Sequence, residues 1–330
     1  MGEFAENKEV GVLLGDPKKA IKSLSVPIAV ALLLQQANMM VSTVWVTGLG
    51  SGALAALGIV NPFFCVILAI GNGLGIGASA ALARNIGMKR LTNAECVAAQ
   101  GLTLMAIAAV FVTPIMLITA EPVLAFAGAG NSITHSLEYA RPLYSCAFII
   151  MMSCMIPSLL RGEGAAKRSM YTQVAMAITN MVLDPIFIYG MNMGVAGAAW
   201  AMIVASLVAT LMGLYWYIRK TTFIKLRIGD FRPRALYIKD IMSVGLPQTM
   251  ELSIMYLFNM VYNFCILLIG SAGVLSAYMI VWRIIYLVLI PAQAVGGAMV
   301  SACSAEFGMR RYDMVKKAFT FSVRFSLISM

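Results

Sequence analysis

The segment Ala177-Ile178-Thr179-Asn180-Met181-Val182-Leu183-Asp184-Pro185-Ile186-Phe187-Ile188-Tyr189 decides how this sequence is interpreted. It places a carboxylate next to a proline inside an apolar run of the kind that crosses a membrane. An ionisable side chain at that depth costs a few kcal/mol and is retained where it faces a bundle interior or a water-filled cavity. We therefore interpret Asp184 as a site for a proton, a cation or a polar substrate. The alternative is a structural carboxylate that caps a kink or pairs with a neighbouring helix.

The neighbours of Asp184 favour the first interpretation. Asn180 lies four residues earlier, so a helix presents both side chains on one face. Pro185 has no N–H and frees the carbonyl of Met181, four residues back. A carboxylate, an amide and a loosened backbone thus meet in one place, and we assign ion or proton coupling to Asp184 and Asn180.

Composition defines the class of protein. The chain has 330 residues, of which 61% are hydrophobic and 12% charged, and its mean hydropathy is +0.87. A soluble domain carries about 25% charged residues, so this deficit indicates a protein embedded in lipid. The net charge of +10 does not indicate nucleic-acid binding, because the basic residues gather in alternate loops between apolar runs. Neither a disulfide framework nor a metal site is predicted from six scattered cysteines and a single histidine, His135.

Apolar runs recur along nearly the whole chain. A membrane span needs about 20 apolar residues, and we predict an all-α polytopic membrane protein without a cleavable signal peptide. The predicted spans lie at about residues 21–46, 53–83, 94–119, 139–160, 171–189, 195–218, 241–269, 276–302 and from 315 onward. The second contains Gly71-Asn72-Gly73-Leu74-Gly75-Ile76-Gly77, which imitates a dinucleotide fingerprint but follows no strand. We interpret this glycine run as a site of close helix packing.

The charges of the loops predict the orientation. Alternate loops are basic and the intervening loops are nearly uncharged. By the positive-inside rule we therefore predict that the protein lies in the cell membrane with its N-terminus in the cytoplasm. The basic positions are Lys18, Lys19, Lys22; Arg84, Lys89, Arg90; Arg161, Lys167, Arg168; Arg219, Lys220, Lys225, Arg227, Arg232, Arg234; and Arg310, Arg311, Lys316, Lys317.

An internal repeat divides the chain. A shift of about 220 residues aligns Ser23 and Pro27 with Ser243 and Pro247, and, with one residue of slip, Gly87-Met88-Lys89-Arg90 with Gly308-Met309-Arg310-Arg311. Six spans separate the copies, so the repeats are parallel and related by an axis along the membrane normal. We predict an N-terminal tail (1–20), an N-lobe (21–218), a basic linker (219–239) and the start of a C-lobe (240–330). The second repeat is truncated, which predicts a fragment of a twelve-span protein.

Other polar residues within spans are candidates for a cavity lining. Gln35 and Met39 are four residues apart, as are Asn259 and Asn263, so each pair can share one helix face. Packing between helices is the commoner role of such amides. Arg283 must find a carboxylate or carbonyls because it cannot lose its charge. Glu251 is one such partner, and it is also a candidate coordinating or coupling residue. Arg161 and Glu163, at the end of the fourth span, we interpret as a loop-locking ion pair or a helix cap.

The sequence resembles a known family. The segments Leu160-Arg161-Gly162-Glu163-Gly164, Asn180-Met181-Val182-Leu183-Asp184-Pro185 and Gly194-Val195-Ala196-Gly197-Ala198-Ala199-Trp200, with Pro27 and Pro247, are similar to the MATE (multidrug and toxin extrusion) family, closest to its prokaryotic DinF-type branch. The resemblance implies twelve helices in two lobes and cation-coupled export of amphipathic, often cationic, organic compounds. It also implies a polar network in the N-lobe that includes Asn180, Asp184 and Tyr139, and it matches Asn38 to an asparagine of the first span.

Three positions depart from the pattern that the resemblance implies. The branch usually has an aspartate shortly after the residue matched by Asn38, where this chain reads Met39-Met40-Val41-Ser42-Thr43. Pro157 and Met202 stand where the family often has an asparagine and a threonine. A two-carboxylate proton site is therefore not expected, although a lone buried aspartate can still take a proton.

We predict a secondary antiporter, with H⁺ or Na⁺ as the coupling ion, no cofactor, small-molecule drugs or metabolites as substrates, and a monomer in the cell membrane. No hydrolase triad, P-loop or pair of catalytic carboxylates is recognisable, so we predict that the protein is not an enzyme. The alternatives are a lipid-linked sugar flippase, which should line its cleft with several cations, and a membrane scaffold, which would not need Asp184.

Overall fold

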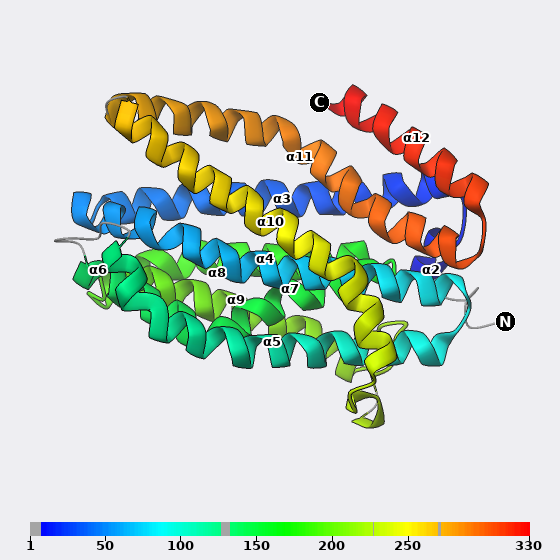
Figure 1. Ribbon diagram of the computed structural model, residues 1–330. Coiled ribbons are helices and arrows are strands. Elements are labelled where there is room, and N and C mark those ends of the chain that lie inside the picture. Colours follow the sequence, from blue (N-terminus) through cyan, green and yellow to red (C-terminus); the bar gives the residue numbers. More distant parts are fainter. Residues whose placement is uncertain (1–7, 127–132, 227, 270–271) are drawn as a thin grey trace.

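The computed structural model describes residues 8–126, 133–226, 228–269 and 272–330, and every element within them is a helix (Figure 1). The all-α prediction is therefore confirmed. The elements are α2 (Lys8–Leu13), α3 (Pro17–Thr47), α4 (Ser51–Gly87), α5 (Leu91–Phe126), α6 (Ile133–Ser145), α7 (Ala147–Gly162), α8 (Ala166–Pro185), η2 (Ile186–Gly190), α9 (Val195–Ile218), η3 (Ile228–Phe231), α10 (Ala235–Ile269), α11 (Ala272–Gly308) and α12 (Tyr312–Ser329).

Within the described residues, five helices are long and apolar enough to cross a membrane, or six if one bent pair forms a single span. They are α3, most of α4, most of α5, α9 and the second part of α11. The other predicted spans coincide with α6–α7, α8 with η2, α10 and α12, which are also helical. The protein is thus a polytopic helical membrane protein, as its composition predicted.

The predicted span 139–160 is not one straight helix. The chain bends by 55° between α6 and α7, at Cys146. Pro142, one turn before the break, has no N–H for the helical ladder, and its ring crowds the preceding turn. A proline-induced bend therefore replaces the continuous span that the apolar pattern suggested.

The N-terminal segment contains a short helix that the sequence did not predict. Val10 and Leu13 of α2 are fully buried in the main hydrophobic core. The carboxylate of Glu9 lies 3.8 Å from Arg168, near the start of α8. Gly164 (φ +88°) brings the α7–α8 loop against the backbone of Glu9, where a Cβ would be only 2.8 Å from its carbonyl oxygen. Within the described part of the N-terminal segment, the chain is thus packed against the helical bundle.

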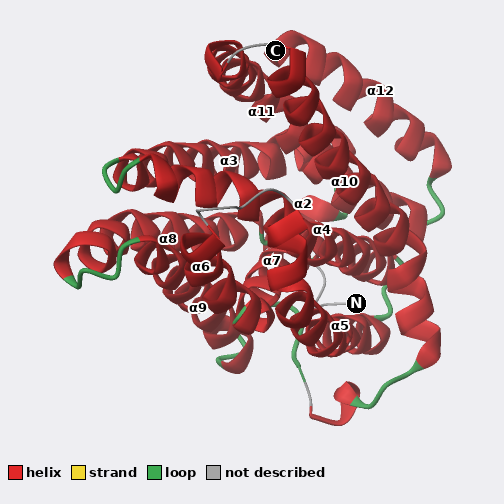
Figure 2. Ribbon diagram, turned by 60° about the vertical axis from the view of Figure 1, so that its left-hand side comes forward, coloured by secondary structure: helices red, strands yellow, loops and turns green. Residues whose placement is uncertain are grey.

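Helices of the two halves pack against each other in matching pairs. α10 packs on α4 and α11 packs on α3, and the repeat maps the first pair onto the second. Both views show α10 running across α4 (Figures 1 and 2). In the glycine run, Gly73 faces Thr249 and Gly77 faces Gly245 so closely that a Cβ would overlap α10. The interpretation of this run as a close-packing site is therefore confirmed.

The halves also meet where α4 and α11 end. A Cβ on Gly87 would overlap the carbonyl oxygen of Ala305, and a Cβ on Gly308 would overlap that of Arg84. We call this contact of Gly87, Gly308, Arg84 and Ala305 the glycine crossing. Beside it, Arg84 of α4 forms an ion pair and hydrogen bond with Asp240 of α10. The basic turns after α4 and α11 lie at this end of the bundle, which we call the basic end.

The basic linker is fixed to α5. Gln100 Nε2 donates to the carbonyl oxygens of Asp230 (2.8 Å) and Arg232 (2.7 Å), and Gln100 Oε1 accepts from the backbone N–H of Arg234 (3.1 Å). Tyr237, in the first turn of α10, donates to Asn93 at 3.2 Å. The beginning of α10 is therefore held by the N-terminal half.

Candidate functional site

Asp184 is buried between α8 and α3. Its side chain is 1% exposed and that of Asn180 is 5% exposed. With its amide nitrogen toward the carboxylate, Asn180 lies 2.9 Å from both oxygens of Asp184 and donates to them. Ser42 of α3 donates its hydroxyl to Asp184 Oδ2, and its Oγ lies 3.4 Å from the Asn180 amide. Asp184, Asn180 and Ser42 form what we call the carboxylate cluster.

The carboxylate cluster contains no positive charge. Among the described residues, no Lys, Arg or His lies within ion-pair distance of Asp184. Buried charges in proteins are normally paired or coordinated to a metal. Two neutral hydrogen-bond donors support a carboxylate, but they do not cancel its charge. The arrangement can therefore exchange a proton or attract a monovalent cation.

The backbone beside Asp184 departs from the regular α-helix. After Pro185 the chain forms the π-helical turn η2, because the proline cannot donate to the ladder. Tyr189, in η2, donates to the carbonyl oxygen of Trp45 at 2.6 Å, and the two rings pack edge to face. The helix is thus irregular after Pro185, and Tyr189 joins this turn to α3. The freed carbonyl of Met181 stays a prediction.

Ser42 is the residue that sequence reasoning missed. The stretch Met39–Thr43 was noted for an absent aspartate, but nothing in its pattern indicated which side chain would reach α8. The structure shows that the hydroxyl of Ser42 is the group of this stretch that contacts Asp184. Pro157 is buried in α7 and Met202 packs against the core, so neither of these two departures supplies a hydrogen bond to the carboxylate.

Tyr139 and Asn38 border the region of the carboxylate cluster. Tyr139 is partly buried and contacts both hydrophobic clusters of the N-terminal half. The smaller of these clusters contains Val46 of α3 and Ile188 of η2, which come four residues after Ser42 and Asp184, respectively. Asn38 of α3 has a buried side-chain oxygen with no hydrogen-bond partner among the described residues. Such an oxygen is free to accept from a ligand or to coordinate a cation.

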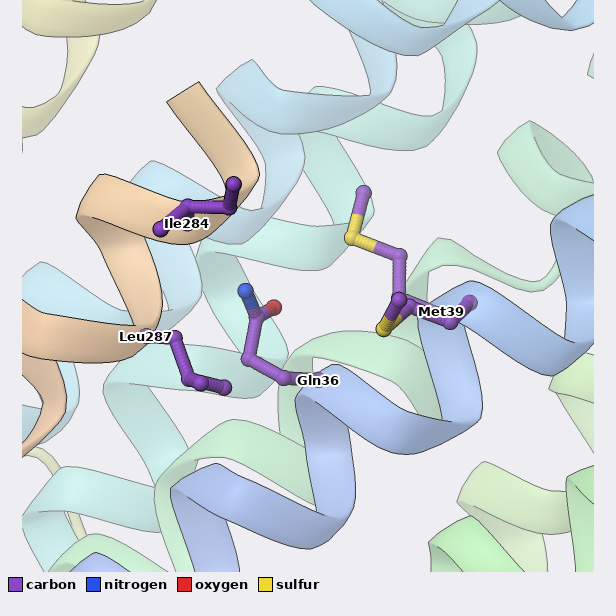
Figure 3. Close-up of a pocket in the computed structure, with 5 residues that line it drawn as sticks. Gln36, Met39, Ile284 and Leu287 are labelled. Atoms are coloured by element: carbon purple, nitrogen blue, oxygen red, sulfur yellow. The ribbon is translucent and has the colours of Figure 1, made fainter. Parts of the chain in front are cut away.

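A pocket of about 150 Å³ lies between α3 and α11 (Figure 3). It is lined by Gln36, Met39, Met40, Ile284 and Leu287. Met39 precedes Ser42 by three residues, so the pocket lies within about one helical turn of the carboxylate cluster. Gln35, which the sequence suggested as a lining residue, is exposed and is not part of this pocket.

The described candidates of the C-terminal half, Glu251 and Asn259, do not join the carboxylate cluster. Glu251 is exposed and accepts a hydrogen bond from Gln248 Nε2 at 3.0 Å. Asn259 is half-buried and donates to the carbonyl of Met255 on its own helix at 3.4 Å. The side chains of Asn263 and Arg283 lie outside the described residues, as does the expected pairing of Arg283 with Glu251.

Arg161 and Glu163 do not form an ion pair, but Glu163 is the C-cap residue of α7, as the other predicted alternative has it. Arg161 donates to Ser158 Oγ at 2.8 Å, whereas Glu163 Oε2 accepts from the backbone N–H of Ile224 at 3.3 Å. Glu163 is buried in the turn after α7, and its other carboxylate oxygen has no partner among the described residues. Burial raises the pKa of Glu163 to about 8. Glu163 thus holds the loop to the linker by itself, because the Arg161 side chain is directed to its own helix.

Taken together, the apolar helices, the two-half architecture and the buried carboxylate define a polytopic membrane transport protein. A model of the MatE family matches residues 27–186 and 247–330. The chain belongs to the MatE family.

Individual relatives agree with this assignment. The multidrug export protein MepA of Staphylococcus saprophyticus is 25% identical over 269 residues, which are 81% of this chain and 59% of MepA. The chain therefore spans less than two thirds of that relative. A crystal structure of MATE in complex with MaL6 is 34% identical, with a TM-score of 0.94 over 98% of this chain and 72% of that one. The outward-facing conformation of a multidrug resistance MATE family transporter gives a TM-score of 0.93 with the same identity and coverage. These relatives are transporters rather than enzymes, as the sequence predicted.

Proposed function

We propose that the protein is a secondary antiporter that exports amphipathic, often cationic, organic compounds in exchange for protons. The observation that carries this proposal is the carboxylate of Asp184, which is 1% exposed and whose hydrogen-bond partners among the described residues are all neutral donors. An ionised carboxylate in such surroundings is costly, so its occupancy by a proton is coupled to the hydration of the site. Binding of a proton or of substrate can then favour different arrangements of the two halves, by the difference in their affinities.

The ion is proposed to be H⁺ on the basis of the donor set. Sodium is held by oxygen lone pairs, whereas the groups that face Asp184 are the Asn180 amide nitrogen and a donating Ser42 hydroxyl. A sodium site would require these groups to reorient and to recruit other oxygens, such as that of Asn38. We therefore place Na⁺ coupling, and any contribution of Glu251, among the outcomes of the test.

The substrate class follows from the pocket between α3 and α11. Its walls are apolar, with one amide, Gln36, and two methionines, Met39 and Met40. Methionine side chains are flexible and polarisable, which suits ligands of varied shape. The charge of a cationic ligand would be attracted by Asp184, which is held by Ser42 on the next turn of α3.

The orientation and the conformation complete the proposal. The basic end is proposed to face the cytoplasm of the cell, in agreement with the positive-inside rule. The glycine crossing and the Arg84–Asp240 ion pair join the halves at this end. Such contacts are expected in an outward-facing arrangement, which the similarity to an outward-facing relative supports.

The test is transport in vesicles that contain the purified chain, in which a pH gradient and a sodium gradient are imposed separately. We expect efflux of a cationic dye to follow the pH gradient and to be lost in Asp184→Asn. The matched control is Asp313→Asn, which changes an exposed acid at the start of α12. Efflux driven only by sodium, or unchanged efflux in Asp184→Asn, would refute proton coupling at this residue. Loss of efflux in Glu251→Gln alone would move the coupling site to the C-terminal half.

A further inference from the structure

Glu306, near the end of α11, is a buried acid that the antiport site does not use. It is 1% exposed, and both of its carboxylate oxygens lack a hydrogen-bond partner among the described residues. Burial of an ionised carboxylate without a partner is very unfavourable. In the arrangement of helices seen here, the stable form of Glu306 is therefore the protonated one.

The charged groups around Glu306 do not neutralise it. Asp16, which caps α3, opposes a negative charge on Glu306, whereas Arg311, in the turn after α11, favours one. Arg311 is exposed and is not within ion-pair distance. Cys303, one turn earlier on α11, is neutral in its thiol form. The remaining charged groups on adjoining elements are engaged or exposed. Arg84 pairs with Asp240, Glu9 lies 3.8 Å from Arg168, and Arg161 donates to Ser158. The exposed groups are Lys18, Lys19 and Lys22 of α3, Arg310, and Asp313, Lys316, Lys317 and Arg324 of α12.

The internal repeat provides a comparison within the same molecule. The residue equivalent to Glu306 is Asn85, which precedes Gly87 as Glu306 precedes Gly308. Asn85 is buried as well, and its amide donates to the carbonyl of Ala81 at 2.9 Å. One half of the molecule thus buries a neutral polar side chain at this position. The other half buries an acid, which is equally neutral only while it keeps its proton.

The position of Glu306 links its proton to the contact between the halves. Ala305, the adjacent residue, faces Gly87 across the glycine crossing, and Gly308 faces Arg84. Water can reach Glu306 only if the helices around it separate, because the side chain is enclosed in the packed structure. Glu306 can ionise only in contact with water, because water must accept the proton and solvate the carboxylate that remains.

We propose that Glu306 is a second proton-binding site, occupied while the glycine crossing is closed and emptied when α4 and α11 separate. The step transfers the proton from the carboxyl oxygen of Glu306 to water, so that carboxylate and hydronium form and no other reactant is needed. Raising the pH at the basic end then favours the open crossing, because only the open form accommodates the anion. This site does not depend on the assignment of Asp184.

The first experiment measures the protonation state directly. Infrared difference spectra of the purified chain, recorded as the pH is raised, should show the loss of the C=O stretching band of a protonated carboxyl group. The part of this band due to Glu306 should be absent in Glu306→Gln and present in the control Glu138→Gln, which changes an exposed acid. A spectrum of Glu306→Gln that is identical to that of the unmodified chain would overturn the proposal.

The second experiment measures the crossing itself. Lys89 and Arg310 are exposed, repeat-equivalent residues in the turns after α4 and α11, where spin labels can be attached through non-canonical amino acids. The distance between the labels should lengthen as the pH rises in the unmodified chain and remain short in Glu306→Gln. Glu306→Asp should restore the pH dependence, and Asp184→Asn should retain it. An equal pH response in Glu306→Gln and the unmodified chain would show that the crossing opens without this proton. The two proposals can fail separately. If Asp184→Asn loses dye efflux, but the label distance responds to pH equally in Glu306→Gln and the unmodified chain, the antiport proposal stands and the Glu306 proposal fails.

Discussion

Gly87 and Gly308 occupy equivalent positions of the repeat, and each packs against the backbone of the helix that carries the other. The two contacts are therefore related by the axis that relates the halves. A repeat-related pair of glycines at a helix crossing allows both backbones to approach without a side chain between them. This relationship places a close backbone contact of α4 and α11 at the basic end.

A methyl group at this crossing should destabilise the protein. In Gly308→Ala the new Cβ overlaps the carbonyl oxygen of Arg84, which lies on backbone and cannot rotate away. We expect a loss of about 1–3 kcal/mol, as for overpacked cores, measured by thermal unfolding in detergent. The control is Gly296→Ala in the same helix, where no atom lies within 4 Å of the new Cβ. Gly296→Ala should be neutral or stabilising, and an equal loss in both variants would contradict the crossing.

The hydroxyl of Ser42 should contribute to the packing of α3 on α8. Ser42→Ala removes the donor to Asp184 and leaves a buried carboxylate with fewer partners. We expect a loss of about 1–2 kcal/mol in the free energy of unfolding, the usual penalty for an unsatisfied buried polar group. Thr43→Val is the control, because Thr43 donates only to the carbonyl of Met39 on its own helix, at 2.7 Å. If the two variants unfold alike, the link between α3 and α8 is not through Ser42.

The sequence was sufficient for the existence of the long helices and for two of the three residues of the carboxylate cluster. Asn180 and Asp184 meet because they are four residues apart on one helix, which periodicity alone predicts. Ser42 could not be found in this way, because its contact with Asp184 depends on how α3 packs on α8, far away in the chain. The buried α2 was missed because Val10 and Leu13 form too short an apolar run to stand out.

Glu306 was missed for a different reason. The predicted span ends at about residue 302, where the apolar run gives way to polar residues, so Glu306 falls outside it. The helix continues to Gly308 and its last two turns are covered by packing from other elements. Helix ends are the least certain part of a prediction, and packing that comes from distant parts of the chain leaves no local pattern.

The buried carboxyl group of Glu163 should make stability depend on pH. Its pKa is about 8 in the folded protein, against an ordinary value of 4.5, because burial disfavours the charged form. The folded state therefore holds a proton that the unfolded state releases between these values. The contribution is fully present below about pH 4.5 and is lost as the pH rises toward 8, by up to roughly 5 kcal/mol at about 1.4 kcal/mol per pKa unit.

Chemical denaturation at several pH values measures this contribution. Glu163→Gln removes the titrating group but keeps an acceptor for the N–H of Ile224. Its free energy of unfolding should fall less between pH 5 and pH 8 (about the window of the shift) than that of the unmodified chain. Glu121→Gln, which changes an exposed acid, should follow the unmodified chain. If the free energy of unfolding falls equally in all three proteins, burial does not raise the pKa of Glu163.

Filling the pocket between α3 and α11 should weaken ligand binding without disturbing the carboxylate cluster. Leu287 lines the pocket from α11, opposite Met39 and Gln36 of α3, and a tryptophan in its place would occupy much of the roughly 150 Å³. We expect Leu287→Trp to weaken the binding of a bulky cationic dye by about tenfold or more, equivalent to about 1.4 kcal/mol, as measured by fluorescence anisotropy. Ile118→Trp is the control, because Ile118 is 77% exposed on α5 and does not line the pocket. Binding that is weakened equally by both variants would reflect a general effect of the added ring. Binding that is unchanged in Leu287→Trp would place the ligand elsewhere, and Asp184 would then act on it from a greater distance than one helical turn.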